Sequence, residues 1–434
     1  MIRNRQIYNI LGLCVGPAPS FSGHFSDYNN LKVNNLPNIS IFDNNLLLPL
    51  ERILSFNYSV DIENTNISQL GTRSLVDRII VSRPSVSFGF NYNLVDIRNE
   101  KALGFITNYP NFTGEPVLGH GVETCCINSF TGNLTDNRNF FLTINNQDND
   151  NINERLSDQF TTINNTPNDL TAQNLYVIGF GNSYISSYQT TASVGNIPQV
   201  SVGYVCDNIL ITSSGSGSQI PAVYPKSGNL VSGVTFTIPR IESNVNPSVI
   251  RPEDINFKIL NTSNLETSGA LFGISSSGIP LQSFDIRLNL PREELKSIGY
   301  VLPLDRRINF PVFCDVNIST IVGNNKTNNL AEVLDTNSNY NLLINMFNHT
   351  CEISGRTVAI QYKINNAKFV NASYGYDIGS NLVGNFGFVA EVDCSQEKGM
   401  FISGTLNIPE LEFPYDFLLL ESNKTGFLFT EDSN

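Results

Sequence analysis

Apolar and polar residues alternate with a period of two along much of the chain, and helical periodicity is almost absent. Alternation of this kind between clusters of Gly, Asn and Pro is typical of half-buried antiparallel strands. It predicts strands at residues 78–94, 199–205, 233–241, 284–290, 355–364 and 385–393. The best candidate helix is 291–299, where Pro291 suits the first turn and Gly299 suits the exit. The expected fold class is all-β with minor α.

One long stretch of the pattern occurs twice. SFNYSVDIENTNISQLGTRSLVDRII at 55–80 aligns without gaps, at a constant offset of 228, with SFDIRLNLPREELKSIGYVLPLDRRI at 283–308. The apolar columns match as well as the identities, and internal self-similarity indicates repeated units. The identical pairs include Gly71 and Gly299, Asp77 and Asp305, and Arg78 and Arg306.

A second pair of segments follows in the same order, at 183–208 and 373–396. Both begin with Ser-Tyr, contain Val-Gly-Asn around Gly195 or Gly384, and place a Cys about ten residues later. Together the two matches predict a tandem duplication of a β-sandwich or split-barrel module. The expected division is an N-terminal arm at 1–46, a first module at 47–220 and a second module at 221–434, with a linker near 212–250. The alternative is that β-rich sequences with Gly turns resemble one another without a duplication.

The composition excludes several classes of function. The chain has 434 residues, 41% hydrophobic and 15% charged, and a net charge of -13, so it can bury real cores but offers no basic surface for clamping phosphate. No apolar run approaches the ~18 residues of a membrane span. Seven cysteines without CxxC spacing predict reduced, mostly buried thiols.

Candidate chemistry is sparse. The three histidines, His24, His120 and His349, lie far apart and outside any metal-ligand spacing. Gly179-Phe180-Gly181 is expected to be a turn rather than a phosphate cradle, since no helix pattern follows it. The acidic stretch at 147–154 lacks the glycine of a calcium loop and is expected to be solvated. No catalytic, cofactor-binding or metal-binding residue is predicted, and we expect that the protein is not an enzyme.

Four blocks resemble tail tube proteins of tailed bacteriophages. They are IYNILGLCVGPAPSFSG at 7–23, LGTRSLVDRIIVSRPSVSFGFNY at 70–92, YVIGFGNSYISSYQTTASVGNIPQVSVGY at 176–204, and LQSFDIRLNLPREELKSIGYVLPLDRRINFPVFCDVNI at 281–318. The resemblance implies modules whose long hairpins join those of neighbours into a continuous β-barrel around a channel. Rings of such subunits stack into a tube through which viral DNA passes without specific binding.

The resemblance also implies a stoichiometry and a location. Family members with one module form six-fold rings, so a chain with two modules implies a ring of three copies with pseudo-six-fold symmetry, with a hexamer as the alternative. The expected partners are other copies of the chain and other tail proteins, with no membrane. The implied location is the tail of the virion, with synthesis in the host cytoplasm.

The residues expected to serve assembly follow from the repeat. Strands at 84–92, 200–204 and 310–318 are expected to form the inner barrel or its support. Local ion pairs, Asp77 with Arg78 and Asp305 with Arg306, are expected to anchor each module's turn, although ordinary surface pairs would look the same in sequence. The full set of candidate assembly residues is Gly71, Asp77, Arg78, Pro84, Gly195, Pro198, Gly299, Asp305, Arg306, Pro311 and Gly384.

Two other classes of protein stay open at this point. One is a different virion part, such as a decoration, baseplate or neck protein. The other is a β-sandwich cell-surface adhesin, which the Asn-rich loops favour and which the lack of a convincing signal peptide disfavours. Self-assembly into long tubes would separate the tail tube from both.

Overall fold

The structure is a computed structural model, which describes residues 8–17, 47–62, 64–71, 73–80, 83–108, 124–131, 137–146, 175–212, 216–231, 235–237, 250–261, 281–321, 339–348, 358–375, 383–393, 395 and 398–404. Strands dominate these residues, and the only α-helix among them is the six-residue α1. The expected all-β class is confirmed.

The elements of the first part of the chain are β1 (Tyr8–Pro17), β2 (Leu48–Leu50), β3 (Ile53–Asp61), β4 (Asn64–Ile67), β5 (Asp77–Ile80), β6 (Ser85–Asn93), α1 (Arg98–Leu103), β7 (Thr107–Asn108), η3 (Asn128–Phe130), β8 (Arg138–Asn146), β9 (Leu175–Ser193) and β10 (Gln199–Thr212). Those of the remainder are β11 (Ser216–Gln219), β12 (Thr235–Thr237), η5 (Pro252–Asp254), β13 (Ile255–Asn261), β14 (Leu281–Asn289), β15 (Arg292–Leu295), β16 (Asp305–Ile308), β17 (Val312–Ile321), β18 (Asn339–Phe347), β19 (Val358–Gly375), β20 (Val383–Val392) and β21 (Met400–Gly404).

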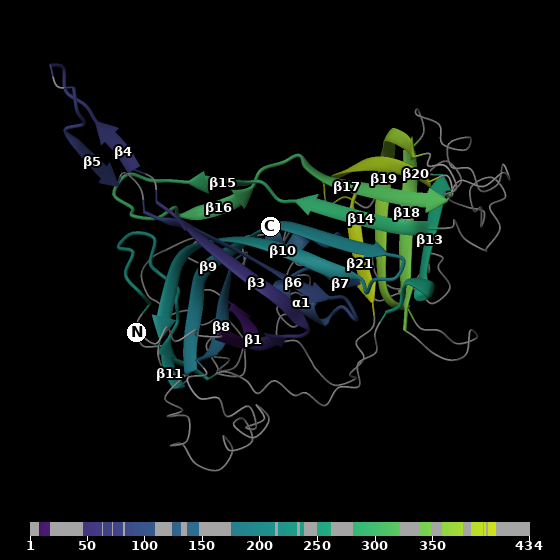
Figure 1. The fold of residues 1–434 in the computed structure, drawn as a ribbon, viewed down its shortest axis with the longest axis horizontal. Helices are drawn as coiled ribbons and strands as arrows, with labels where there is room; N and C mark the ends of the chain where they lie inside the picture. Colours follow the sequence, from purple (N-terminus) through teal and green to yellow (C-terminus); the bar gives the residue numbers. More distant parts are fainter. Residues whose placement is uncertain are drawn as a thin grey trace, which may run out of the picture.

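The same strand order occurs twice within one 15-stranded sheet. In the first half the order is β1-β8-β9-β10-β6-β3, and in the second it is β13-β18-β19-β20-β17-β14, with antiparallel pairing throughout both series. The bounds of β3, β4 and β5 recur in β14, β15 and β16 at the offset of 228 seen in the sequence. Figure 1 shows the two halves side by side along the long axis.

Alternation along each strand builds a core between two layers. In β6 every second residue is buried, and one of them, Phe88, contacts Phe140 from β8, Phe180 from β9 and Tyr204 from β10 at ring-centroid distances of 5.1, 4.7 and 5.2 Å. β8 and β6 lie on opposite sides of this core. The first half is therefore a β-sandwich, and β9 and β10 connect its two layers along one side. Buried residues of the two halves belong to one hydrophobic cluster, so the halves do not have separate cores.

Two sequence expectations about local structure are wrong. Residues 291–299 are not a helix, because Arg292–Leu295 pairs with Asp305–Ile308 as the β15–β16 hairpin, with Gly299 at φ 86° in the connecting turn. Gly71, at φ 95°, has the same place between β4 and β5. Gly179-Phe180-Gly181 is not a turn but lies within β9, where both glycines face the backbone or ring of Pro221.

The other predicted strands occur with shifted bounds. Residues 78–94 contain β6 and all but the first residue of β5, 199–205 begin β10, and 284–290 include most of β14. Residues 355–364 include the first part of β19, from Val358, and 385–393 include most of β20. In the predicted strand at 233–241, only Thr235–Thr237 is described as strand. No helix in the described part of the chain has the length and apolar character that crossing a bilayer requires.

The predicted N-terminal arm and the predicted linker both contribute residues that pack on the first half. Leu13 and Val15 of β1 are fully buried in the common core, so this strand of the predicted arm is a member of the first sandwich. Ile220, Ala222 and Val231 pack against Cys14, Phe141 and Val177 in a second, smaller cluster. The segment after β11 is thereby held on the first half.

Candidate assembly interface

The two halves are joined edge to edge by a strand pair. β14 pairs with the C-terminal half of β9 over seven positions, from Ser283 opposite Ser193 to Asn289 opposite Ser187. Backbone bonds from Val194 to Gln282 and from Leu290 to Ser186, both 2.9 Å, extend the pairing at its two ends. We call this contact the internal joint. Because of it, strands of both halves form one continuous sheet in the order β19-β20-β17-β14-β9-β10-β6-β3.

A buried ion pair fixes the β15–β16 hairpin beside the internal joint. Arg306 of β16 donates from Nε and Nη2 to Oδ1 of Asp207 in β10 at 3.2 and 3.0 Å, and both side chains are almost fully buried. Arg306 also pairs with Glu294 of β15. Burial raises the pKa of Asp207, and the charge of Arg306 opposes that shift. The pair therefore links the hairpin of the second half to the sheet of the first.

The expected local ion pairs are therefore wrong as to their partners. Asp305 accepts a hydrogen bond from the backbone N–H of Arg306 at 2.8 Å, and Asp77 accepts the equivalent bond from Arg78 at 2.7 Å. The guanidinium of Arg306 reaches Asp207 instead, while that of Arg78 donates from Nε to Asn66 at 2.9 Å on an exposed hairpin. The Asp-Arg sequence thus shapes the strand backbone, and the Arg side chain is directed elsewhere.

A buried polar network lies between the halves. Oε1 of Glu100 in α1 accepts hydrogen bonds from Tyr92 of β6 at 2.7 Å and from Tyr188 of β9 at 3.2 Å. The hydroxyl of Tyr188 in turn lies 2.7 Å from that of Tyr362 in β19. Among the described residues, Oε2 of Glu100 has no hydrogen-bond partner. Burial raises the pKa of Glu100 to about 7, although the Tyr92 hydrogen bond acts in the opposite direction.

This network predicts a pH-dependent contribution to stability. Glu100 has a higher pKa in the folded chain than its ordinary value of 4.5, so its stabilising contribution is complete at acidic pH and is lost as the pH rises through about 7. In Glu100→Gln the side chain stays neutral, and we expect the variant to gain about 3 kcal/mol relative to the parent between pH 4.5 and 7. Urea unfolding of both proteins across this range measures the difference.

The control is Glu253→Gln, because Glu253 is exposed on the 3-10 turn η5. The difference in free energy of unfolding between this variant and the parent should be the same at every pH. If the difference between Glu100→Gln and the parent also stays constant with pH, Glu100 ionises in the folded chain as it does in the unfolded chain, and the prediction is wrong.

The outward face of the joined sheet is polar and mostly uncharged. Its side chains alternate with the buried ones, and an open groove crosses the surface over the internal joint. Gln189 of β9 donates to Asp285 of β14 at 2.8 Å across the joint on this face. Members of the face are Ser87, Asn91, Asn93, Ser187, Gln189, Thr191, Ser193, Gln199, Ser201, Ser283, Asp285, Arg287, Asn289, Asp315, Asn317, Ser319, Asn371, Ser373, Asn385 and Glu391, with Phe313 as an exposed apolar member. We call this surface the polar face.

The remaining predicted residues fall at strand ends, with one exception. Pro84 and Pro311 are exposed and directly precede β6 and β17, and Gly195 and Pro198 lie in the β9–β10 turn, where Gly195 has φ 85°. Gly384 is buried inside β20 opposite Thr320, so it does not correspond to Gly195. The predicted equivalence of the two Val-Gly-Asn motifs is wrong.

The pairing gives the correct correspondence for these strands. β10 meets β6 with Cys206 opposite Val86, and β20 meets β17 with Ala390 opposite Cys314. Since Val86 and Cys314 differ by 228, Cys206 corresponds to Ala390, an offset of 184. At this offset the bulge that skips Ser186 in β9 matches the bulge that skips Val370 in β19. Asp207 then corresponds to Glu391.

Sequence reasoning missed Glu100, Asp207 and Glu391, because the partners of the first two are distant in sequence. The described cysteines, Cys14, Cys125, Cys126, Cys206 and Cys314, are buried and form no disulfide bond with one another. The histidines and the acidic stretch at 147–154 lie outside the described residues. Within the described part of the chain, no group of three or more His, Cys, Asp or Glu is arranged to hold a metal ion.

No protein-family model matches the sequence, and no curated protein is significantly similar to it. The chain is similar to chains in two cryo-EM structures of the anti-feeding prophage. One is the cap that terminates its tube, with 12% identity, a TM-score of 0.25, and coverage of 38% of this chain and 97% of that chain. The other is its 6-fold symmetrised baseplate, with 12% identity, a TM-score of 0.21, and coverage of 39% and 98%. At these values the likeness assigns the chain to no family.

Proposed function

We propose that the protein is a structural component of a phage tail that self-assembles into rings, and that these rings stack into a tube for the passage of DNA. The observation that carries the proposal is the internal joint, in which one sandwich half extends the sheet of a similar half edge to edge. A joint of this kind can be repeated between chains, and closure of the sheet into a ring removes exposed edges. The proposal includes a tandem duplication, virion location and no catalytic activity.

The polar face supports a place on the wall of a channel. Its side chains are mainly hydroxyls and amides, and the chain has a net charge of -13. A surface without clustered Lys and Arg offers no counterion release on contact with phosphate, which is the main source of non-specific affinity for DNA. DNA would therefore move along such a wall without being held. The resemblance to tail tube proteins gives the expected stoichiometry of three copies and six sandwich halves per ring.

Negative-stain electron microscopy of the untagged protein at increasing concentration tests this function. We expect stacked rings whose end-on class averages show three-fold symmetry and six similar lobes. Six-fold rings made of twelve lobes would retain the tube and change the stoichiometry. Single rings that do not stack would favour a cap, baseplate or neck protein. A monomer at every concentration would contradict self-assembly and favour a decoration protein or an adhesin.

A further inference from the structure

The two sandwich halves differ in how their edges are covered. β14 is held between β17 and β9, whereas its counterpart β3 pairs with β6 and ends the strand order. Likewise, β9 has partners on both sides, with β10 along residues 177–191 on one side, and β8 along 175–183 and β14 along 187–193 on the other. In its counterpart β19, residues 369–375 pair with β20 alone among the described strands. Two strand edges equivalent to those of the internal joint therefore have no partner among the described strands, one at β3 and one at residues 369–375 of β19.

Exposure of apolar side chains marks the same two edges. In β3 and the residue after it, Tyr58, Val60 and Ile62 are 47, 41 and 51% exposed, and in β19 Val370 is 61% exposed. The counterparts of the first three in and after β14 are Ile286, Leu288 and Leu290, which are 0, 0 and 1% exposed. The inward positions of β3 are thus apolar like those of the covered strand β14, and apolar residues grouped along an exposed edge indicate a contact with another chain.

We infer that β3 of one copy adds to the 369–375 edge of β19 in a second copy, in the register of the internal joint. The inference rests on the proposed function, since it specifies the contact that closes the ring. Transferring the internal pairs by the offsets of 228 and 184 places Asn57 opposite Gly375, Ser59 opposite Ser373, and Asp61 opposite Asn371 of the neighbour. The occupant of each edge is therefore a second copy of this chain, through strand addition.

The charges at the two edges are complementary. Arg78 corresponds to Arg306, and Glu391 corresponds to Asp207, so the register brings Arg78 of one copy to Glu391 of the next. In the single chain Arg78 lies on the β4–β5 hairpin, which projects from the body of the molecule (Figure 1). Glu391 is partly exposed, with Lys398 Nζ at 3.0 Å from its Oε2. Docking of the neighbour would cover Arg78 as Arg306 is covered here.

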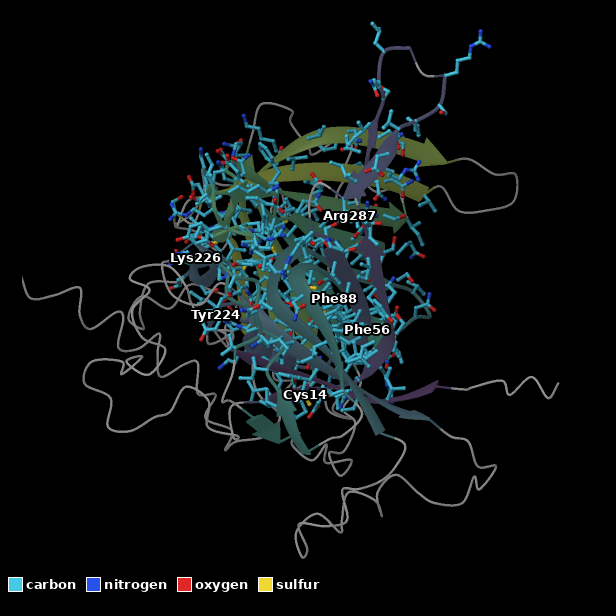
Figure 2. All side chains as sticks on the ribbon, turned by 90° about the vertical axis from the view of Figure 1, so that its left-hand side faces the viewer. Cys14, Phe56, Phe88, Tyr224, Lys226 and Arg287 are labelled. Carbon is cyan, nitrogen blue, oxygen red and sulfur yellow. The ribbon has the colours of Figure 1, made fainter. Side chains whose placement is uncertain are left out.

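β3 is already held in a shape that can accept a partner. Its inner side chain Phe56 stacks on Phe88 and on Phe90, with ring-centroid distances of 5.5 and 6.4 Å. Figure 2 labels Phe56 and Phe88 among the side chains. On the other face the hydroxyls of Ser59 and Ser87 lie 2.8 Å apart. Because β3 is paired and packed on one side, it offers an extended row of backbone groups without the entropy loss of ordering a loose segment.

Disulfide trapping tests the register. In the internal joint the backbone bonds join Gln282 to Val194 and Leu290 to Ser186, so the alternate pair Arg287 and Gln189 is not hydrogen-bonded. Its transferred equivalent, Ser59 with Ser373, should have Cα atoms about 4.5 Å apart, which suits a disulfide. We expect Ser59→Cys/Ser373→Cys to give covalent dimers and trimers under mild oxidation, with no species above the trimer.

The matched control is Ser59→Cys/Ala372→Cys, which moves one cysteine to the opposite face of the strand. It should give roughly tenfold less covalent product, because a one-residue slip reverses the side-chain direction. The two single Ser→Cys variants measure the background from native cysteines. Rings in electron microscopy together with equal cross-linking in the two double variants would overturn the proposed register and leave the proposed function standing. Absence of both rings and cross-links would contradict both.

A charge exchange gives an independent test of the same contact. We expect Arg78→Glu to shift the concentration needed for assembly upward by roughly tenfold, because it places like charges together at the joint. Adding Glu391→Arg in the same chain should restore assembly, since the exchanged pair meets again in every contact between copies. Failure of the double exchange to assemble better than either single variant would show that the two side chains do not meet.

Discussion

Replacing Arg306 by Leu is expected to lower the free energy of unfolding by about 3–5 kcal/mol, because it leaves the carboxylate of Asp207 buried without its cation. Asp207 lies with its side chain almost fully covered, and burial already raises its pKa in the presence of Arg306. Without the guanidinium the pKa should rise further. The deficit of the variant should therefore be largest at neutral pH and should shrink as the solution is made acidic.

Urea unfolding followed by circular dichroism suits this measurement, since the chain has no Trp. Arg78→Leu is the matched control, because Arg78 has the same position in the β4–β5 hairpin but is exposed. Its stability should change by no more than about 0.5 kcal/mol, while its assembly should weaken. Asp207→Asn should recover part of the loss in the Arg306→Leu background. Equal losses for the two Arg variants would contradict the structural role of the Arg306 pair.

Gly181→Ala is expected to cost about 3 kcal/mol of stability, because a Cβ at this position would overlap the backbone O and C of Pro221. The backbone near Pro221 has little freedom to move. Its carbonyl accepts a hydrogen bond from Asn208 at 2.7 Å, and Ala222 is fully buried in the smaller cluster. Farther along, the Pro225 carbonyl accepts from Val301 and Leu302 in the β15–β16 turn region. Displacement of this segment should therefore also loosen the hairpin.

Gly179→Ala provides the graded control on the same face of β9. Its Cβ would meet the ring carbons of Pro221 at 3.0 Å rather than the backbone, and small adjustments of the ring can relieve that contact. We expect a loss of roughly 1 kcal/mol. Thermal unfolding of the parent and both variants gives the ranking. A larger loss for Gly179→Ala than for Gly181→Ala would show that the Pro221 backbone is free to move.

Much of the strand pattern could be predicted from the sequence where the repeat was long and ungapped. In the match between 55–80 and 283–308, the strands of the two halves begin and end at equivalent residues, 228 positions apart. The helix expected at 291–299 failed because Pro, Glu and Gly are as suitable for a hairpin as for a short helix. Pairing with Asp305–Ile308, which is distant in sequence, decided between them.

The second match failed for a related reason. Ser-Tyr and Val-Gly-Asn are short motifs that recur in Gly-rich β proteins, and they aligned the β9–β10 turn with the first residues of β20. The true register depends on which residues face one another across β6 and β17. The residues that matter most at the joint, such as Asp207 and Arg306, are 99 positions apart. No local pattern could predict their contact, and Arg306, which the sequence repeat singled out, was assigned a neighbouring residue as its partner.

The internal joint has a consequence for how assembly begins. Every chain would carry one strand addition already made as part of its own folding, so a ring of six sandwich halves would need only two encounters between separate molecules before its last contact closes, whereas six separate halves would need five. Each encounter that is avoided spares the loss of translational and rotational freedom that association imposes. The covalently linked contact can be as apolar as a protein interior, as Ile286 and Leu288 show by their complete burial. The intermolecular contact has to remain compatible with water until a neighbour arrives, and its serines, asparagines and isolated apolar residues fit that requirement.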